Sequence, residues 1–307
     1  MSKIRTDLAM ESFQSAGQEH LPGVKINRWD QMGVDITEVL VQDEHAAAEL
    51  GKPRGAYLTL ECPALRRRDV EARLAMANLL GEELGRLVRA EAASPVLVVG
   101  LGNRDVTPDS LGPLAIDRVL VTRHMFREIP EYTDQRLRSV CAIAPGVLGV
   151  TGIETLEMVQ SLVRTLQPGA VVCVDSLAAR ATSRICAAVQ LTDTGIQPGS
   201  GVGNHRRALT KESLGVDVVS LGMPTVIYAA TLARDAMELL APQGLQENDA
   251  AFNSFERELN GTELGEMIVT PREIDALVAD AAEVIAAGIN KALQPALSDE
   301  EILAMMD

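Results

Sequence analysis

The chain has 307 residues and a formal net charge of −15, with 47% hydrophobic and 3% aromatic residues. This length supports one enlarged domain, alone or with a smaller subdomain, and the acidity argues against nucleic acid or an anionic membrane as a partner. The opening residues, MSKIRTDLAMES, lack an apolar signal segment and no run approaches about 18 apolar residues, so we expect a cytoplasmic protein.

The first half of the chain predicts alternating strands and helices. Residues 56–61 alternate weakly, as in a strand, and apolar residues at helical spacing across 69–91 predict an amphipathic helix. The β-branched run Val96–Gly100 indicates a buried parallel strand that ends in a glycine turn. A helix is expected to begin at Leu111, with Pro113 near its first turn.

The second half continues this alternation. The sequence Thr270-Pro271-Arg272-Glu273 is typical of a capping box before a helix that ends near Leu293. The polar stretch 242–265 is expected to be an insertion or loop. Together the pattern predicts an α/β fold, a three-layer sandwich with a mostly parallel central sheet. The other expected elements are strands at 140–143, 170–174 and 216–221 and helices at 151–166 and 224–240.

The turn Gly100-Leu101-Gly102-Asn103 first resembles a dinucleotide-binding loop. That fingerprint requires a third glycine, and the position is occupied here by Asp105, an unfavourable neighbour for a pyrophosphate. We therefore interpret Gly100 and Gly102 as residues that permit a sharp turn, and Asn103 as a side chain that braces it.

Two carboxylates follow the apolar strands. Asp109 lies nine residues after Gly100, and Asp175 comes directly after the run 170–174. Because chemistry in open α/β sheets gathers beyond the carboxyl ends of the strands, the two acids indicate a paired-carboxylate site. Such a pair shares a proton, so that one partner activates water while the other donates to a carbonyl. The alternative for each acid is a capping role at a helix or strand end.

Other residue types give weaker signals. A carboxylate–histidine metal site that includes His124 or His205 stays open, although no HExxH spacing occurs, and no GxSxG nucleophile motif is present. The loop 198–207 is either a flexible surface loop or a flap whose Arg206 and Arg207 bind acidic side chains. The cysteines lack CxxC spacing and are expected to be buried and reduced. They are Cys62, Cys141, Cys173 and Cys186.

Six sequence blocks, taken in order, resemble the germination protease (spore protease) family across nearly the whole chain. The resemblance implies an atypical aspartic peptidase of a spore-forming bacterium, with a fold similar to hydrogenase maturation peptidases and with Asp109 and Asp175 as its catalytic residues. It further implies small acid-soluble spore proteins as substrates and a homotetramer in the spore core. We expect no cofactor, and whether a metal ion contributes stays open. The blocks are Arg5–Glu11, Val99–Asn103 with Thr107–Pro113, Val174–Arg180, Pro198–Asn204, Gly222–Val226 and Val269–Asp275.

The resemblance also gives the N-terminus a role, because family members are zymogens that remove a short leader. The family's cut site, an acid followed by an apolar residue, alanine, any residue and an acid, matches Asp7-Leu8-Ala9-Met10-Glu11. We therefore expect a leader at 1–7, cleavage between Asp7 and Leu8, and a peptidase domain at 8–307; the alternative is a disordered terminus. Candidate counter-charges for the substrate acid are Arg104, Arg180, Arg206 and Arg207.

Two other functions remain as alternatives at this point. One is a metal-dependent maturation peptidase in which Asp109 and Asp175 would bind a divalent ion. The other is a non-catalytic protein that holds a partner at the edge of the sheet.

Overall fold

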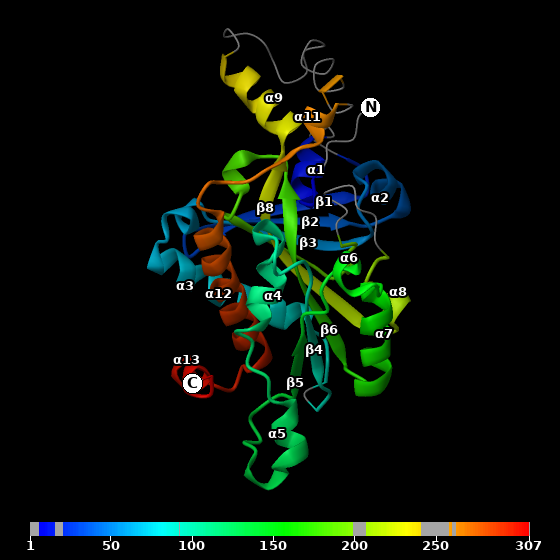
Figure 1. Ribbon diagram of the computed structural model, residues 1–307, viewed down its shortest axis with the longest axis vertical. Coiled ribbons are helices and arrows are strands. Elements are labelled where there is room, and N and C mark those ends of the chain that lie inside the picture. The colour runs from blue at the N-terminus through cyan, green and yellow to red at the C-terminus, as the bar shows by residue number, and fades with distance from the viewer. Residues whose placement is uncertain are drawn as a thin grey trace.

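A computed structural model of the chain describes residues 6–15, 21–91, 93–198, 207–240, 258–259 and 262–306. Within these residues nine strands form one sheet in the order β1-β2-β3-β7-β8-β6-β4-β5, and β9 pairs with β8. Helices cover the sheet in Figure 1, with α3 and α12 on one side of the view, α7 and α8 on the other and α4 between them. The strands are β1 Val24–Gln31, β2 Val34–Val41, β3 Gly55–Glu61, β4 Val96–Gly100, β5 Val140–Ile143, β6 Ala170–Ala179, β7 Ala188–Thr192, β8 Asp217–Tyr228 and β9 Ile268–Val269.

The α-helices vary from single turns to the long α12, which packs against α3. Short 3-10 turns lie between several elements, at η1 Pro63–Arg67, η2 Thr107–Asp109, η3 Pro130–Tyr132 and η4 Thr182–Arg184. The α-helices are α1 Ala9–Ser15, α2 Glu44–Leu50, α3 Val70–Leu87, α4 Leu111–Ile116, α5 Arg123–Glu128, α6 Leu148–Thr151, α7 Thr155–Leu166, α8 Lys211–Leu214, α9 Ala229–Leu240, α11 Glu263–Glu266, α12 Ile274–Leu293 and α13 Asp299–Ala304.

The sheet is mixed, which corrects the expectation of a mostly parallel one. Strands β5, β4, β6 and β8 run parallel to one another, as predicted from their apolar runs. The other half, β1-β2-β3-β7, is antiparallel throughout and joins β8 in the antiparallel sense. β1 and β2 form a hairpin joined by a short turn. Such an antiparallel pair extends the sheet without the crossover helix that a parallel pair requires.

The core lies on both faces of the sheet, because side chains alternate along each buried strand. In β4, Val96 and Val98 join the cluster that includes residues of α3, α4 and α12. Leu97 and Val99 join a second cluster that includes Leu156 of α7. The arrangement of helix layers on either side of the sheet agrees with the α/β prediction.

Two strands are longer than predicted. β6 continues to Ala179 and β8 continues to Tyr228, so the helix expected from Pro224 begins at Ala229 as α9. Pro224 is tolerated inside β8 because the pairing of β8 with β7 ends at Gly222 and its register with β6 shifts past Leu177. The shift is a bulge that leaves Thr225 without a register partner on β6.

The proposed capping box before α12 is wrong. The helix begins at Ile274 with Glu273 at the N-cap position, where no side-chain cap hydrogen bond is made within the described residues. The Thr270 hydroxyl instead donates to the carbonyl of Thr225 in β8 at 2.8 Å. Most of the expected insertion at 242–265 lies outside the described residues, apart from Glu258, Leu259 and the segment that contains α11.

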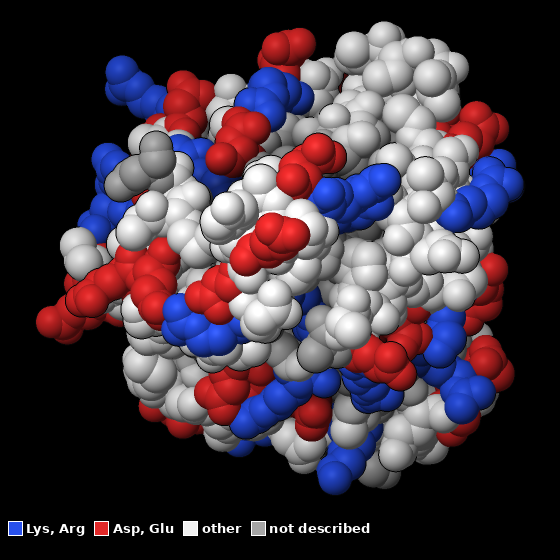
Figure 2. Space-filling view, turned by 90° about the horizontal axis from the view of Figure 1, so that it is seen from below, with Lys and Arg blue, Asp and Glu red and all other residues white. Residues whose placement is uncertain are grey.

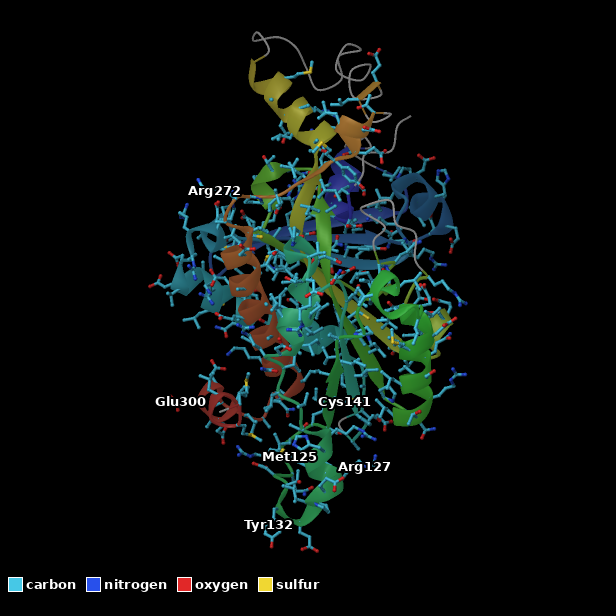
Figure 3. The ribbon with its side chains drawn as sticks, viewed as in Figure 1. Met125, Arg127, Tyr132, Cys141, Arg272 and Glu300 are labelled. Atoms are coloured by element: carbon cyan, nitrogen blue, oxygen red, sulfur yellow. The ribbon has the colours of Figure 1, made fainter. Side chains whose placement is uncertain are left out.

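Charged side chains of both signs alternate over the face drawn in Figure 2. The negative net charge is therefore not gathered into one patch on that face. At one end of the molecule, the segment of α5 and η3 projects away from the sheet (Figure 3), and Tyr132 at its tip is 84% exposed.

Candidate active site

The loop after β4 folds back so that Asp109 lies against the end of the strand. Asp109 ends the 3-10 turn η2, in which its N–H donates to the carbonyl of Val106 at 2.7 Å. Its Oδ2 accepts the main-chain N–H of Asn103 at 2.8 Å. Ser110, not Asp109, occupies the N-cap position of α4. The carboxylate therefore turns back toward the glycine turn.

Close approaches of the backbone explain the glycines in this loop. Gly102 has φ +114°, and a Cβ added there would lie 2.0 Å from the carbonyl oxygen of Asp109. A Cβ on Gly112, in the first turn of α4, would lie 2.3 Å from the carbonyl oxygen of Leu101. Only glycine fits such positions, so these residues bring α4 and Asp109 onto the end of β4. Asn103 also braces the turn as predicted, because its Oδ1 accepts the N–H of Asp105 at 3.0 Å.

Asp175 is inside β6 rather than after it, yet it lies just past the end of the neighbouring strand β4. Gly100, the last residue of β4, pairs with Val174, and Asp175 pairs only with Gly222 on the other side. Asp175 is 5% exposed, and its Oδ1 accepts the N–H of Ser176 at 2.9 Å.

The two acids lie at one junction of the sheet. The N–H of Leu101 donates to the carbonyl of Val174 at 2.8 Å, so the residue before Gly102 is bonded to the residue before Asp175. From β8, the Thr225 hydroxyl donates to the carbonyl of Pro108 at 2.7 Å and fixes the loop that carries Asp109. Both acid-bearing segments therefore meet at the carboxyl end of β4, although β6 itself continues past Asp175 to Ala179.

Asp175 also ends a row of register partners that crosses five strands. We call this the polar row: Thr37, Thr59, Gln190, Gly222 and Asp175 pair in turn on β2, β3, β7, β8 and β6. Directly paired residues present their side chains on the same face of a sheet. The four side chains of the row are buried, and the Thr59 hydroxyl has no hydrogen-bond partner within the described residues.

Two of the four predicted counter-charges, Arg104 and Arg180, are engaged in ion pairs with other acids. Arg104 forms a two-pronged ion pair with Asp117, at 2.6 and 2.9 Å, which raises the pKa of Arg104 and lowers that of Asp117. Arg180 pairs with Asp235 at 2.8 Å. The Arg207 main chain donates to Glu154 at 3.2 Å. Arg206, like most of the loop 198–207, lies outside the described residues.

The predicted cleavage segment is docked on the fold. Leu8 and Ala9 are fully buried and lead into α1, so the described part of this terminus is not disordered. Asp7 donates its N–H to the carbonyl of Ala178 at 2.9 Å, and its own carbonyl accepts from Lys52 Nζ at 2.8 Å and Gln190 Nε2 at 3.0 Å. Sequence reasoning missed Lys52 and Gln190, because neither lies in a block that resembles the family.

Metal-ligand residues do not gather in the described structure. No group of three or more His, Cys, Asp or Glu side chains among the described residues has a geometry that could hold a metal ion. His124 lies on α5, whose preceding residue Thr122 bonds to Val140 at the amino end of β5, away from the carboxyl ends that carry the acids. His205 lies outside the described residues.

The cysteines are reduced, as predicted, and three of the four are buried. Burial raises the pKa of Cys186 to about 12 and raises that of Cys173 as well, where the charge of Asp175 adds to the effect. Cys141 is only partly buried. Burial and a raised pKa make Cys173 and Cys186 poor nucleophiles.

Known proteins resemble this chain along nearly its whole length. The sequence profile described as Germination protease matches residues 4–260. The chain belongs to the germination protease family. A germination protease of Caldanaerobacter subterraneus subsp. tengcongensis is 41% identical over 97% of both chains. That of Clostridium perfringens strain ATCC 13124 is 39% identical over 98% of both, and that of Bacillus mycoides is 36% identical over 94% of this chain and 93% of the relative.

As a germination protease, the chain is a spore peptidase and thus a hydrolase. None of the helices within the described residues is both long and apolar enough to cross a bilayer.

Proposed function

We propose that this germination protease is an aspartic endopeptidase in which Asp109 and Asp175 act as a pair. The observation that carries the proposal is the junction at which the Leu101–Val174 hydrogen bond joins the two acid-bearing segments. The family membership supplies peptidase chemistry, and within the site these are the acids at the carboxyl edge of the parallel strands.

In this mechanism the pair holds one proton and one water molecule. The ionised carboxylate takes a proton from the water molecule while the water oxygen bonds to the carbonyl carbon of the substrate. The protonated carboxyl donates its proton to the carbonyl oxygen of the substrate. Collapse of the tetrahedral intermediate breaks the C–N bond, and the nitrogen leaves with a proton from the pair. The apparent pKa values governing the rate belong to the pair as a unit.

The proposed substrates are small acid-soluble spore proteins, cut after an acidic residue in the spore core. The chain itself is proposed to be a zymogen that cuts between Asp7 and Leu8, which removes a leader at 1–7 and leaves a peptidase domain at 8–307. The proposed assembly is a homotetramer. These steps follow from the family resemblance and from the match of residues 7–11 to the family's cut site.

The test replaces each acid by its amide. Asp109→Asn and Asp175→Asn should each lower self-cleavage and peptide cleavage at least a thousandfold with an unchanged far-UV circular dichroism spectrum, measured by N-terminal sequencing and by peptide turnover. Asp105→Asn, an exposed acid in the same loop, is the matched control and should keep its activity. Full activity in either Asn variant would remove the aspartic mechanism, and loss of activity with a chelator that added metal restores would replace it by a metal-dependent one.

A further inference from the structure

Asp7 occupies a binding site built from three separate elements. Its carboxylate Oδ2 accepts the N–H of Ala178 in β6 at 2.8 Å. Its carbonyl accepts from the Lys52 ammonium, which also donates to the Thr6 carbonyl at 3.1 Å. The amide of Gln190 completes the site, because its nitrogen donates to the Asp7 carbonyl and its oxygen accepts the N–H of Ala9 at 2.7 Å.

This site adjoins the candidate catalytic pair. Gln190 and Asp175 belong to the same polar row, and only Gly222 separates them. Two strand spacings amount to about 10 Å between their Cα atoms. Gly222 has no side chain to place between them, and Ala178 lies three residues past Asp175 on the same strand. The Asp7 carbonyl is the one that self-cleavage would attack.

The edge of β6 that binds Asp7 is the edge that β4 leaves open. β4 ends opposite Val174, so the main-chain groups of β6 past that point have no strand neighbour on this side among the described residues. The main chain of Ala178 exchanges hydrogen bonds with Asp7 there. An open strand edge of this kind is a general way to bind an extended peptide.

The second acid of the cleavage motif is held as closely. Glu11 is 1% exposed, and its carboxylate accepts the N–H groups of Arg180 at 2.6 Å and Ala181 at 2.9 Å and the guanidinium of Arg184 at 2.8 Å. Both acids of Asp7-Leu8-Ala9-Met10-Glu11 are therefore recognised by donors past the end of β4 and in the turn that follows β6.

We propose that Ala178, Lys52 and Gln190 form the subsite that recognises the acidic residue of a substrate peptide, and that Asp7 occupies this acid subsite in cis. The proposal rests on the proposed peptidase function and names Lys52, which is not among the four predicted arginines, as the cation of the subsite. The subsite takes a peptide with Asp or Glu before the scissile bond, and that acidic residue lies along the open edge of β6. While Asp7 is bound, a substrate and the leader compete for the same donors.

The charge of Lys52 gives the subsite its preference for an acid over the corresponding amide. Lys52 is half-buried, and burial lowers the pKa of its ammonium, while the charges of Asp7 and Glu11 raise it. A neutral residue in place of Asp7 would leave that ammonium without one of its two opposite charges, the one with the larger effect. An unpaired charge in a partly desolvated site costs far more than a lost contact at the surface.

The test measures binding of two fluorescein-labelled peptides by anisotropy to the full-length Asp109→Asn variant, in which cleavage is suppressed. The peptides are Glu-Leu-Ala-Met-Glu and Gln-Leu-Ala-Met-Glu. Asp7→Lys, which places a cation beside Lys52 and ejects the leader, should tighten binding of the Glu peptide at least tenfold, equal to about 1.4 kcal/mol. In that background the Glu peptide should bind at least tenfold more tightly than the Gln peptide.

Lys52→Met, added to the same background, should abolish the preference for Glu over Gln. The matched control is Lys211→Met, which removes an exposed lysine that pairs with Asp217 and should leave the preference intact. If Lys52→Met does not fold, Gln190→Met should weaken binding of both peptides at least threefold by removing one donor. A Glu preference that survives Lys52→Met, an affinity that Asp7→Lys leaves unchanged, or unaltered binding in Gln190→Met would overturn the proposal.

The two proposals fail separately. The anisotropy measurement requires no catalysis, so it reports on the acid subsite even if Asp109 and Asp175 do not cut peptides. Retained cleavage in Asp109→Asn would contradict the aspartic mechanism and leave the binding result in place.

Discussion

Gly102 determines where the Asp109 carboxylate can lie. Its φ of +114° and the 2.0 Å approach of the Asp109 carbonyl exclude any side chain. Gly102→Ala should therefore lower the free energy of unfolding by about 3 kcal/mol and reduce peptide cleavage at least a hundredfold. Urea unfolding and peptide turnover measure the two effects.

The matched control for that substitution is Gly149→Ala in α6. A Cβ at Gly149 meets no atom within 4 Å among the described residues, so both quantities should stay near those of the parent chain. Equal behaviour of the two alanine variants would show that the glycine turn does not position Asp109.

Cysteine reactivity should follow burial. Cys141 lies on β5 at the end of the molecule that carries α5 (Figure 3), and it is partly buried. Cys173 is fully buried, and its pKa is raised by burial and by Asp175. Iodoacetamide at pH 8 should therefore label Cys141 at least tenfold faster than Cys173, as followed by mass spectrometry of tryptic peptides. Comparable rates at the two sites would mean that the sheet opens readily.

Among the site residues, the sequence allowed Asp109, Asp175 and the glycine turn to be predicted, because each follows a local strand or turn signal. Lys52 and Gln190 could not be found in this way. Each contributes through a contact with Asp7, which is 45 residues from Lys52 and 183 from Gln190. A local sequence pattern cannot indicate a contact between residues that are so far apart in the sequence.

The buried end of α12 is held to the segments around it by side-chain amides. Gln294 is 1% exposed, and it accepts the N–H of Arg138 at 2.9 Å and donates to the Arg138 carbonyl at 3.0 Å. Gln294→Leu leaves the Arg138 N–H unpaired, while the Arg138 carbonyl still accepts from the Thr122 hydroxyl at 2.5 Å, and should lower the free energy of unfolding by about 2 kcal/mol. Gln135→Leu, at an exposed glutamine, should change it by less than about 0.5 kcal/mol. A negligible loss in Gln294→Leu, measured by urea titration, would contradict this account.

At the level of elements, the sequence predicted β3 and the parallel strands β4, β5, β6 and β8, and it missed β7 and the hairpin of β1 and β2. β1 is largely exposed, so it has no regular alternation to detect. The turn between β1 and β2 places Met32 at φ +58° and Gly33 at φ +74°, a geometry usually formed by Asn-Gly or Asp-Gly. Pro224 led to the wrong prediction of a helix start, because proline is common in the first turn of a helix. In the structure it lies inside β8, beside a bulge.

The proposed tetramer is a property of the whole molecule that light scattering can check. A homotetramer would have four times the 32.9 kDa mass of the chain. Size-exclusion chromatography with multi-angle light scattering should give that mass at micromolar concentration in 0.15 M salt, which screens the repulsion between subunits of net charge −15. A monomer mass under these conditions would remove the tetramer from the proposal.

The polar row limits where insertions and deletions can occur in this protein. Side chains alternate between the two faces of a strand, so one codon gained or lost between Ala170 and Asp175 would turn the acid toward the face that packs against α3 and α12. The same change in a loop between strands does not alter which face of the sheet the strand side chains point to. We expect insertions and deletions to be tolerated in those connections and to inactivate the protein within β6.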